Sequence, residues 1–535
     1  MIISCALVGM GAVFLSIPPA LGSARFVRLF RRRQDPHHTH RQPVPRMGGL
    51  ALAVAFIVVE LYLSIAFPEQ RTKTPGRLVV LLSSLAMFAL GFWDDIKPLG
   101  AKRKLLGQIA IALTVCGFGI GIQQFKIPFT STVLDLGGWG VFLTVLWLVG
   151  MTNLINLIDG VDGLAGGICL MLMVLLIYVG HDSSGFECLG AGMAGALIGF
   201  LWFNFPPARV YLGDSGAYFL GFQIGLLSLI NSHKGTVLMA MVAPMFVLAL
   251  PILDTGLAIL RRGLRGLPIF RADKRHLHHH LLRMGLSRRK VVFYFYGVTL
   301  LFMAMAFAAY WSRGNLIPVL LGVGSLILLL CAGRLRFSRN WFAVRRVVSG
   351  SLQMREEVQY TLALMRWLEL EGGRHISVNE LWSDFVLAAQ RLGYTSVKLS
   401  LADGERAWAS SDGCLRTHSV VEALEGGRLG SLELKAPACE TGAVLVPGTQ
   451  SCKRSFCPCV ADEQVFEIVS ELLAEGWIKA VRKLESGDQD PLRFDTKRAS
   501  PSRSVRRRSS FSSPASVRIP QASHKPADSL GNAAR

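Results

Sequence analysis

Residues 153–167, NLINLIDGVDGLAGG, place two side-chain amides and two carboxylates close together at the end of an apolar run. Asn153, Asn156 and Asp159 recur every three residues, so they share one face if a helix continues through them, and Asp162 extends this face into a glycine-rich turn. Amide and carboxylate oxygens suit a hard cation such as Mg²⁺, which also binds substrate phosphates. Helix capping would explain one or two of these residues but not all four.

The elements that must position these residues are strongly apolar. The chain has 535 residues, of which 51% are hydrophobic and only 17% are charged, whereas about 25% are charged in an average soluble protein. The apolar residues form runs of roughly 17–25, the length that crosses about 30 Å of hydrocarbon. We expect an all-α polytopic membrane protein with about eleven transmembrane helices, at about 2–22, 47–67, 78–93, 105–123, 139–157, 165–180, 188–205, 215–231, 236–260, 291–311 and 315–333.

The charges of the loops predict the orientation of these helices. The first apolar run has no basic residue ahead of it and is followed by five arginines, which favours a retained helix with its N-terminus outside over a cleaved signal. With this orientation the cytosolic loops carry 22 Lys and Arg and the outer loops carry 6, as the positive-inside rule requires. The net charge of +21 therefore reflects topology and a basic tail, and we expect no nucleic-acid partner.

Every cluster of unusual polar residues falls on the predicted cytosolic side. Besides the opening stretch, these clusters are DPHHTHRQPVPRMGG (35–49), WDDIKPLGAKRK (93–104), RVYLGDSGA (209–217) and FRADKRHLHHHLLRMG (270–285). Ionisable residues at the membrane are costly and usually functional. Five segments on one face predict a single active site at the membrane surface.

These motifs together resemble the polyprenyl-phosphate N-acetylhexosamine-1-phosphate transferases (glycosyltransferase family 4), most of all the bacterial undecaprenyl-phosphate GlcNAc-1-phosphate transferases. The resemblance spans about residues 35–290 and rests on the Asp94–Asp95 pair, the N-x-x-N-x-x-D-G-x-D-G-L-A block, the G-D-S-G turn at 213–216 and the H-x-H-H block at 276–279. It implies transfer of HexNAc-1-phosphate, foremost GlcNAc-1-phosphate, from a UDP-sugar to undecaprenyl phosphate. The reaction would take place at the cytoplasmic face of the bacterial inner membrane and would release UMP. It would be the first step of lipid-linked cell-envelope polysaccharide synthesis.

The resemblance also implies roles for individual residues. Asn156 and Asp214 would contact Mg²⁺, with Mn²⁺ as the alternative ion, and Asp94 or Asp95 would orient or deprotonate the lipid phosphate. Asp159 and Asp162 would act in catalysis, holding the nucleotide or sugar and ordering the metal's outer shell. The implied substrate-binding residues are Asn153, His276, His278, His279, Arg271, Lys274, Arg275 and Arg46.

Three alternatives stay open beside this reading. The phospho-MurNAc-pentapeptide translocase belongs to the same superfamily, although the HLHH block followed by LLRMG looks more like the GlcNAc branch. A secondary transporter would place its polar residues near the middle of the membrane on broken, repeated helices, and no internal repeat is evident. A receptor anchored by its spans would leave the five polar clusters unexplained. The sequence does not identify the oligomeric state, and a homodimer is one arrangement left open.

The C-terminal part has a different character. We assign residues 1–340 to the transmembrane catalytic domain and 350–484 to a cytosolic α+β domain, with strands expected at SVKLSLA (396–402), GRLGSLELKA (427–436) and AVLVP (443–447). Its order of elements loosely resembles a GAF-type sensory domain. Residues 485–535 are rich in Ser, Arg and Pro and are expected to be a disordered basic tail. Of the ten cysteines, five lie in or at the ends of spans, where they would behave as small apolar residues. Of the other five, Cys439, Cys452, Cys457 and Cys459 could bind zinc, but C-x12-C-x4-C-x-C is not a standard zinc spacing, so free thiols are expected.

Overall fold

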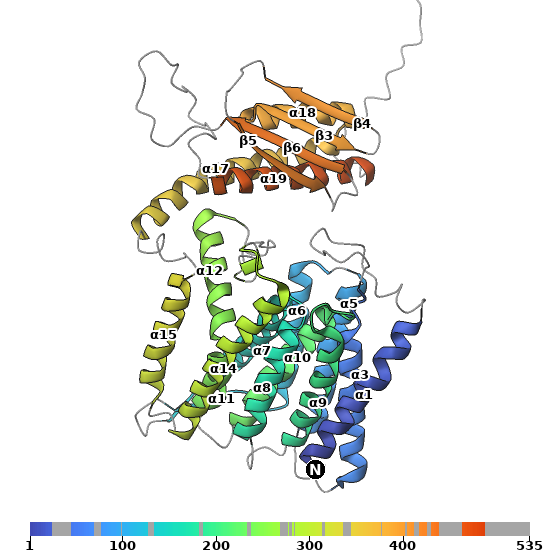
Figure 1. Cartoon of the computed structure of the whole chain (residues 1–535), viewed down its shortest axis with the longest axis vertical. Coiled ribbons are helices and arrows are strands. Elements are labelled where there is room, and N and C mark those ends of the chain that lie inside the picture. The colour runs from blue at the N-terminus through green and yellow to red at the C-terminus, as the bar shows by residue number, and fades with distance from the viewer. Residues whose placement is uncertain are drawn as a thin grey trace, which may run out of the picture. The chain divides into compact units, whose positions relative to one another are not determined.

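The computed structural model describes residues 1–23, 44–68, 76–97, 99–126, 133–180, 186–232, 237–267, 277, 281–282, 284–312, 316–334, 344–375, 377–401, 404–410, 417–424, 430–437 and 463–486. Within these ranges six helices are long and apolar enough to cross a membrane: α1 (Ile2–Gly22), α3 (Gly48–Ala66), α5 (Arg77–Ile96), α7 (Gly138–Ile158), α9 (Glu187–Asn204) and α14 (Arg288–Trp311) (Figure 1). The chain is therefore a multi-pass helical membrane protein. The count of eleven spans stays a prediction.

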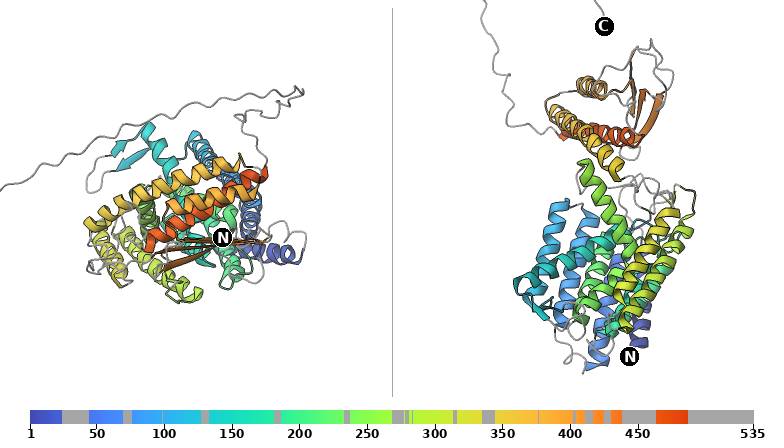
Figure 2. Two further views of the ribbon diagram at one scale, coloured as in Figure 1. Left: turned by 90° about the horizontal axis from the view of Figure 1, so that it is seen from above. Right: turned by 90° about the vertical axis from the view of Figure 1, so that its left-hand side faces the viewer.

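Further helices pack beside these six (Figure 2). They are α6 (Ala101–Gly117), α8 (Leu164–Gly180), α10 (Gly213–Ser232), α11 (Val237–Val247), α12 (Ala249–Arg265) and α15 (Ile317–Arg334). A short antiparallel hairpin, β1 (Gln124–Lys126) and β2 (Val133–Asp135), precedes α7.

The single span expected at 236–260 was wrong in one respect, because the structure divides it into α11 and α12 at Leu248. Pro251 stands in the first turn of α12 and has no backbone N–H to donate to the Val247 carbonyl. A continuous helix would lack this bond and would bring the proline ring against the preceding turn, which favours a break here.

Helix α10 lies in the middle of the membrane domain and packs against α3, α5, α7, α8 and α11. Its side chains Tyr218, Phe219 and Phe222 are fully buried. Glycines on its neighbours let backbones come close: a Cβ at Gly91 of α5 would lie 2.6 Å from the Asp214 carbonyl oxygen. Small residues at helix contacts are typical of membrane bundles because they allow close approach. These contacts fix the start of α10 against its neighbours.

The C-terminal part has its own hydrophobic core, centred on Trp477 and Phe385, whose ring centroids lie 4.9 Å apart. It contains α17 (Val344–Gly372), α18 (Val378–Arg391), α19 (Glu463–Ser486) and an antiparallel sheet of order β4-β3-β6-β5. The strands are β3 (Ser396–Leu401), β4 (Gly404–Ala409), β5 (Thr417–Leu424) and β6 (Gly430–Pro437).

The sequence predicted β3 and β6 but not the edge strands β4 and β5. Strand β4, GERAWA, contains Glu405 and Arg406 and has no buried residue, so its apolar pattern is weak. A third predicted strand, at 443–447, lies outside the described residues, as does the expected basic tail beyond Ser486.

Candidate active site

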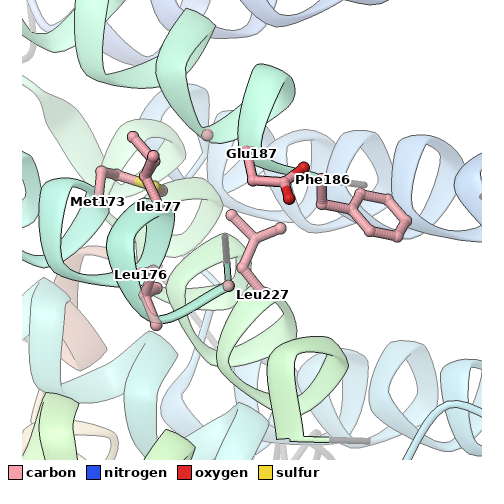
Figure 3. A pocket seen from close by; sticks show the side chains of 8 residues that line it. Met173, Leu176, Ile177, Phe186, Glu187 and Leu227 are labelled. Carbon is pink, nitrogen blue, oxygen red and sulfur yellow. The ribbon is translucent and has the colours of Figure 1, made fainter. Parts of the chain in front are cut away.

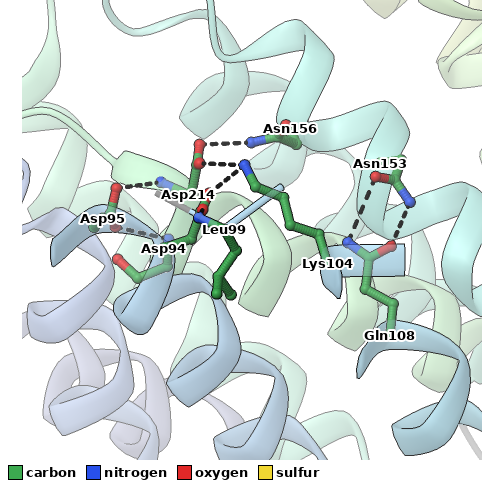
Figure 4. A network of polar contacts seen from close by, with 9 residues as sticks. Asp94, Asp95, Leu99, Lys104, Gln108, Asn153, Asn156 and Asp214 are labelled. Carbon is green, nitrogen blue, oxygen red and sulfur yellow. Dashed lines mark hydrogen bonds and ion pairs between the residues drawn. The ribbon is translucent and has the colours of Figure 1, made fainter. Parts of the chain in front are cut away.

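Four helix ends bring their polar side chains into one network (Figure 4). Asp94 and Asp95 stand in the last turn of α5, Lys104 in the first turn of α6, Asn156 in the last turn of α7, and Asp214 in the first turn of α10. These residues are far apart in the sequence, and their meeting confirms that separate polar segments converge on one place.

The carboxylate of Asp95 holds the N-terminus of α10. Its Oδ1 accepts a hydrogen bond from the Asp214 backbone N–H at 3.0 Å, and its Oδ2 accepts one from the Ser215 N–H at 2.9 Å. The first amides of a helix have no partner within the helix and carry partial positive charge, so a carboxylate satisfies both needs. Gly213 has a positive φ of 77° and a Cβ there would lie 2.7 Å from Asp95 Oδ2, which explains the glycine.

Lys104 links the two other carboxylates of the network. Its ammonium forms an ion pair with the fully buried Asp94 and lies 3.5 Å from Asp214 Oδ2. Asp94 also accepts a hydrogen bond from the Leu99 N–H at 2.6 Å. Asn156 donates from Nδ2 to Asp214 Oδ1 at 3.0 Å. One cation thus lies between two carboxylates, and the pair keeps an excess of negative charge.

Asn153 lies one turn before Asn156 and faces α6. Its Nδ2 donates to Gln108 Oε1 at 2.6 Å, and Gln108 Nε2 lies 3.5 Å from Asn153 Oδ1. The two amides therefore tie α7 to α6 beside the lysine. Sequence reasoning singled out neither Lys104 nor Gln108.

The predicted helical face ends sooner than the three-residue spacing suggested. Helix α7 stops at Ile158, and Asp159 follows as its C-cap. Burial, the nearby carboxylates of Asp214 and Asp95, and Asp162 beyond them raise the pKa of Asp159 well above its usual value, while the charge of Arg46 opposes the rise. Asp159 therefore lies within electrostatic reach of the network and of Arg46.

Asp162 contacts residues outside this network. Its Oδ2 accepts a hydrogen bond from the Ala208 N–H at 3.3 Å and forms an ion pair with Arg288 Nη1 at 3.4 Å. These contacts connect the turn after α7 to the loop before α10 and to the start of α14. In the structure Asp162 holds these three segments together.

Asn204, at the end of α9, reinforces the same connection. Its Oδ1 accepts from the Gly163 N–H at 2.9 Å and its Nδ2 donates to the Val210 carbonyl at 2.8 Å. Tyr296 of α14 donates from its hydroxyl to the Gly163 carbonyl at 2.6 Å. Asn204 is almost fully buried. A lone asparagine in FNFPP gave no sequence signal of this role.

The segment that carries Arg46 is paired with the loop before α10. The Tyr211 N–H donates to the Pro45 carbonyl, and the Gly48 N–H donates to the Tyr211 carbonyl, both at 2.9 Å. This pairing brings Arg46 to the carboxylates. The predicted residues Arg271, Lys274, Arg275, His276, His278 and His279 lie outside the described residues. Their neighbour Leu277 is described, and its N–H donates to Asp254 Oδ1 at 3.0 Å.

A pocket among the helices lies away from this network (Figure 3). It is lined by Met173, Ile177, Glu187 and Leu227, among others. Leu227 comes thirteen residues after Asp214 on α10, which places it about 20 Å along the helix axis. The lining is mostly apolar, and the polar network is the better candidate for chemistry.

Comparison with known proteins places the chain in a family. Residues 77–232 match the model of glycosyl transferase family 4. A probable undecaprenyl-phosphate N-acetylglucosaminyl 1-phosphate transferase of Bacillus subtilis is 36% identical over 49% of this chain and 72% of the relative. A decaprenyl-phosphate N-acetylglucosaminephosphotransferase of Mycobacterium tuberculosis is 31% identical over 50% of this chain and 72% of the relative. A phospho-N-acetylmuramoyl-pentapeptide-transferase of Listeria innocua is 30% identical over 53% of this chain and 89% of the relative.

These relatives match about half of the chain, and the family model covers the network from Asp94 to Asp214. Three of the four motifs that suggested the resemblance, the Asp94–Asp95 pair, the block at 153–165 and the G-D-S-G turn, lie within the matched residues 77–232, and the H-x-H-H block at 276–279 lies beyond them. The chain belongs to glycosyl transferase family 4, the superfamily of polyprenyl-phosphate N-acetylhexosamine-1-phosphate transferases.

Proposed function

We propose that this protein transfers GlcNAc-1-phosphate from UDP-GlcNAc to undecaprenyl phosphate, releasing UMP, at the cytoplasmic face of a bacterial inner membrane. The names of the Bacillus subtilis and Mycobacterium tuberculosis relatives support the sugar and the polyprenyl acceptor. The excess of Lys and Arg in the loops on the site's side supports the orientation.

The observation that carries the proposal is the joining of Asp94, Lys104, Asn156 and Asp214 at the ends of four helices. A polyprenyl chain stays in lipid while its phosphate reaches the surface, so the reaction needs a polar site at helix ends. Phosphoryl transfer depends mostly on positioning and on stabilising negative charge. A cation and hydrogen-bond donors among carboxylates provide both.

The residues present fit a divalent ion. Two carboxylates share one lysine, which leaves negative charge uncompensated, and the donors are the oxygen type that Mg²⁺ takes. Asp214 and Asn156 would hold the ion, with Mn²⁺ as the alternative. When bound, it would neutralise the diphosphate of the UDP-sugar. Asp95 positions the metal site and does not bind the ion, because its hydrogen bonds to the first amides of α10 fix the position of Asp214.

Lys104 and Asp94 serve the acceptor in this mechanism. A phosphate monoester has a second pKa of about 6, so the lipid phosphate is largely dianionic at neutral pH and needs no strong base. Asp94 therefore holds Lys104 in place, and the lysine ammonium directs the phosphate oxygen toward the β-phosphorus. Arg46, whose charge acts on Asp159 and Asp214, adds positive charge to the site. Asp159, Asn153 and the histidine block hold the nucleotide and sugar.

The test uses membranes that contain the full chain, labelled UDP-GlcNAc, undecaprenyl phosphate and Mg²⁺. We expect release of UMP and a lipid-linked label. Asp214→Asn should lower turnover at least ~100-fold, because it removes a charge from the reacting site. Asp135→Asn is the matched control, since Asp135 is an exposed residue of the β2 strand. Unchanged turnover in Asp214→Asn would remove its metal role, and no lipid-linked product from the wild type would refute the reaction.

A second candidate is phospho-MurNAc-pentapeptide transfer, which the Listeria innocua relative favours through its 89% coverage. A panel of UDP-sugar donors in the same assay separates the two. Turnover with UDP-MurNAc-pentapeptide and none with UDP-GlcNAc would replace our proposal with this one.

A further inference from the structure

Two thiols meet at one end of the helix bundle. Cys5 stands in the first turn of α1, and Cys188 is the second residue of α9. Their thiols lie close enough to interact with each other. Both are free thiols in the structure and both are buried, with exposed fractions of 0% and 3%. The sequence predicted only that they act as small apolar residues.

The packing of α1 on α9 brings the two backbones close enough for a covalent link. A Cβ at Gly9 would overlap the carbonyl oxygen of Gly192, and a Cβ at Gly195 would overlap that of Ala6. Cys5 precedes Gly9 by four residues, and Cys188 precedes Gly192 by four. Residues four apart lie one above the other on a helix. The cysteines therefore lie one turn beyond a contact between glycines, and the close packing of the two backbones favours the short Cα separation that a disulfide requires.

This end of the bundle is remote from the polar network. Helix α9 ends at Asn204, beside the Gly163 turn, and Cys188 comes sixteen residues earlier, about 24 Å along the axis. The Met1 amino group and Arg77 lie within electrostatic reach of the Cys5 sulfur, and Glu187 lies within reach of Cys188. Charged groups mark this end as the opposite membrane boundary. With the network in the cytosol, the thiols lie at the extracytoplasmic side, where disulfides persist.

We propose that Cys5 and Cys188 form a disulfide that ties α1 to α9 at the extracytoplasmic end of the protein. During insertion, before α1 packs on α9, the Cys5 thiolate attacks a disulfide of an extracytoplasmic thiol oxidase and releases one of its sulfurs as a thiol. The Cys188 thiolate then attacks the Cys5 sulfur of this mixed disulfide and releases the second. Two thiols of the chain become one disulfide, and one disulfide of the oxidase becomes two thiols. The proposal rests on the orientation given under the proposed function and has no part in the transfer reaction.

The test uses the full chain with a protease site inserted between α3 and α5, at residues 69–75. Cells are treated with N-ethylmaleimide before lysis, so that no bond forms afterwards. Their membranes are then cleaved and run on a gel without reductant. We expect the two fragments to migrate together and to separate with dithiothreitol. Cys5→Ser and Cys188→Ser should each abolish the linked band. Cys169→Ser, a buried thiol of α8, is the matched control and should keep it.

Thermal unfolding provides a second readout. Cys5→Ser, Cys188→Ser and the double variant should lower the midpoint by the same amount, because all three lose one bond, and dithiothreitol should lower the wild type to that value. Reduced wild type should regain the linked band with oxidised glutathione. Fragments that separate without reductant, before and after oxidised glutathione, would overturn the proposal.

The outcome is separable from that of the proposed function. Asp214→Asn should keep the linked band while it loses turnover. A linked band in a wild type that lacks transferase activity would refute the reaction alone, and an active wild type without the band would refute the disulfide alone.

Discussion

Replacing Lys104 by Met tests whether one lysine balances two carboxylates. Its ammonium pairs with Asp94, which is 0% exposed, and with Asp214, which is 22% exposed. Two unit charges 3.5 Å apart attract by ~5 kcal/mol at an effective dielectric constant of about 20. Removing one partner of a buried pair costs about 3–5 kcal/mol, because the other charge stays buried without compensation. We therefore expect Lys104→Met to destabilise the fold by about 3–5 kcal/mol.

The assay is thermal unfolding in detergent, followed by circular dichroism, where this loss corresponds to a drop on the order of 10 °C. Lys102→Met is the control, since Lys102 is exposed on the same helix. Adding Asp94→Asn to Lys104→Met should recover part of the loss, because the orphaned carboxylate is gone. The charge argument is wrong if Lys104→Met unfolds at the same temperature as Lys102→Met. It is also wrong if the effect of the double variant equals the sum of the effects of Lys104→Met and Asp94→Asn alone.

Three further predictions follow from the same contacts. Gly91→Ala should destabilise the protein by about 1–3 kcal/mol, because its Cβ would press on the backbone of α10, and thermal unfolding should separate it from Gly150→Ala, where nothing lies within 4 Å. Asn204→Ala should cost about 2–4 kcal/mol in the same assay, because it leaves a buried N–H and a buried carbonyl unpaired. Removing divalent ions with EDTA should abolish turnover in the transferase assay, and Mg²⁺ or Mn²⁺ should restore it; full activity in EDTA would contradict the metal site.

The membrane class of the protein and the residues at the centre of the network could be predicted from the sequence. The polar clusters stood out because ionisable residues at the membrane are costly and usually functional, and the family resemblance then pointed to Asp94, Asp95, Asn156 and Asp214 within them. Their meeting in the structure follows from helices that all end on one side.

Other parts could not be predicted for definite physical reasons. Lys104 lies in the run AKRK, where positive-inside charge looks the same as a functional cation. The contact of Asp162 with Arg288 joins residues 126 positions apart, and periodicity describes only local structure. The thiol pair was missed because a cysteine in an apolar helix resembles any small side chain. The break at Leu248 was missed because the residues on either side of it, MFV and ALPIL, form one apolar run, and Pro251 was not weighed against that run.

Asp94 and Asp95 are consecutive residues with different partners, one on the lysine of α6 and the other on the first amides of α10. Each residue of a helix turns by about 100°, so one inserted or deleted residue in α5 would swing both carboxylates away at once. Chimeras that exchange this helix between family members must therefore keep Asp94 and Asp95 on the same face of α5. An insertion or deletion that preserves both contacts must comprise close to a whole number of helical turns.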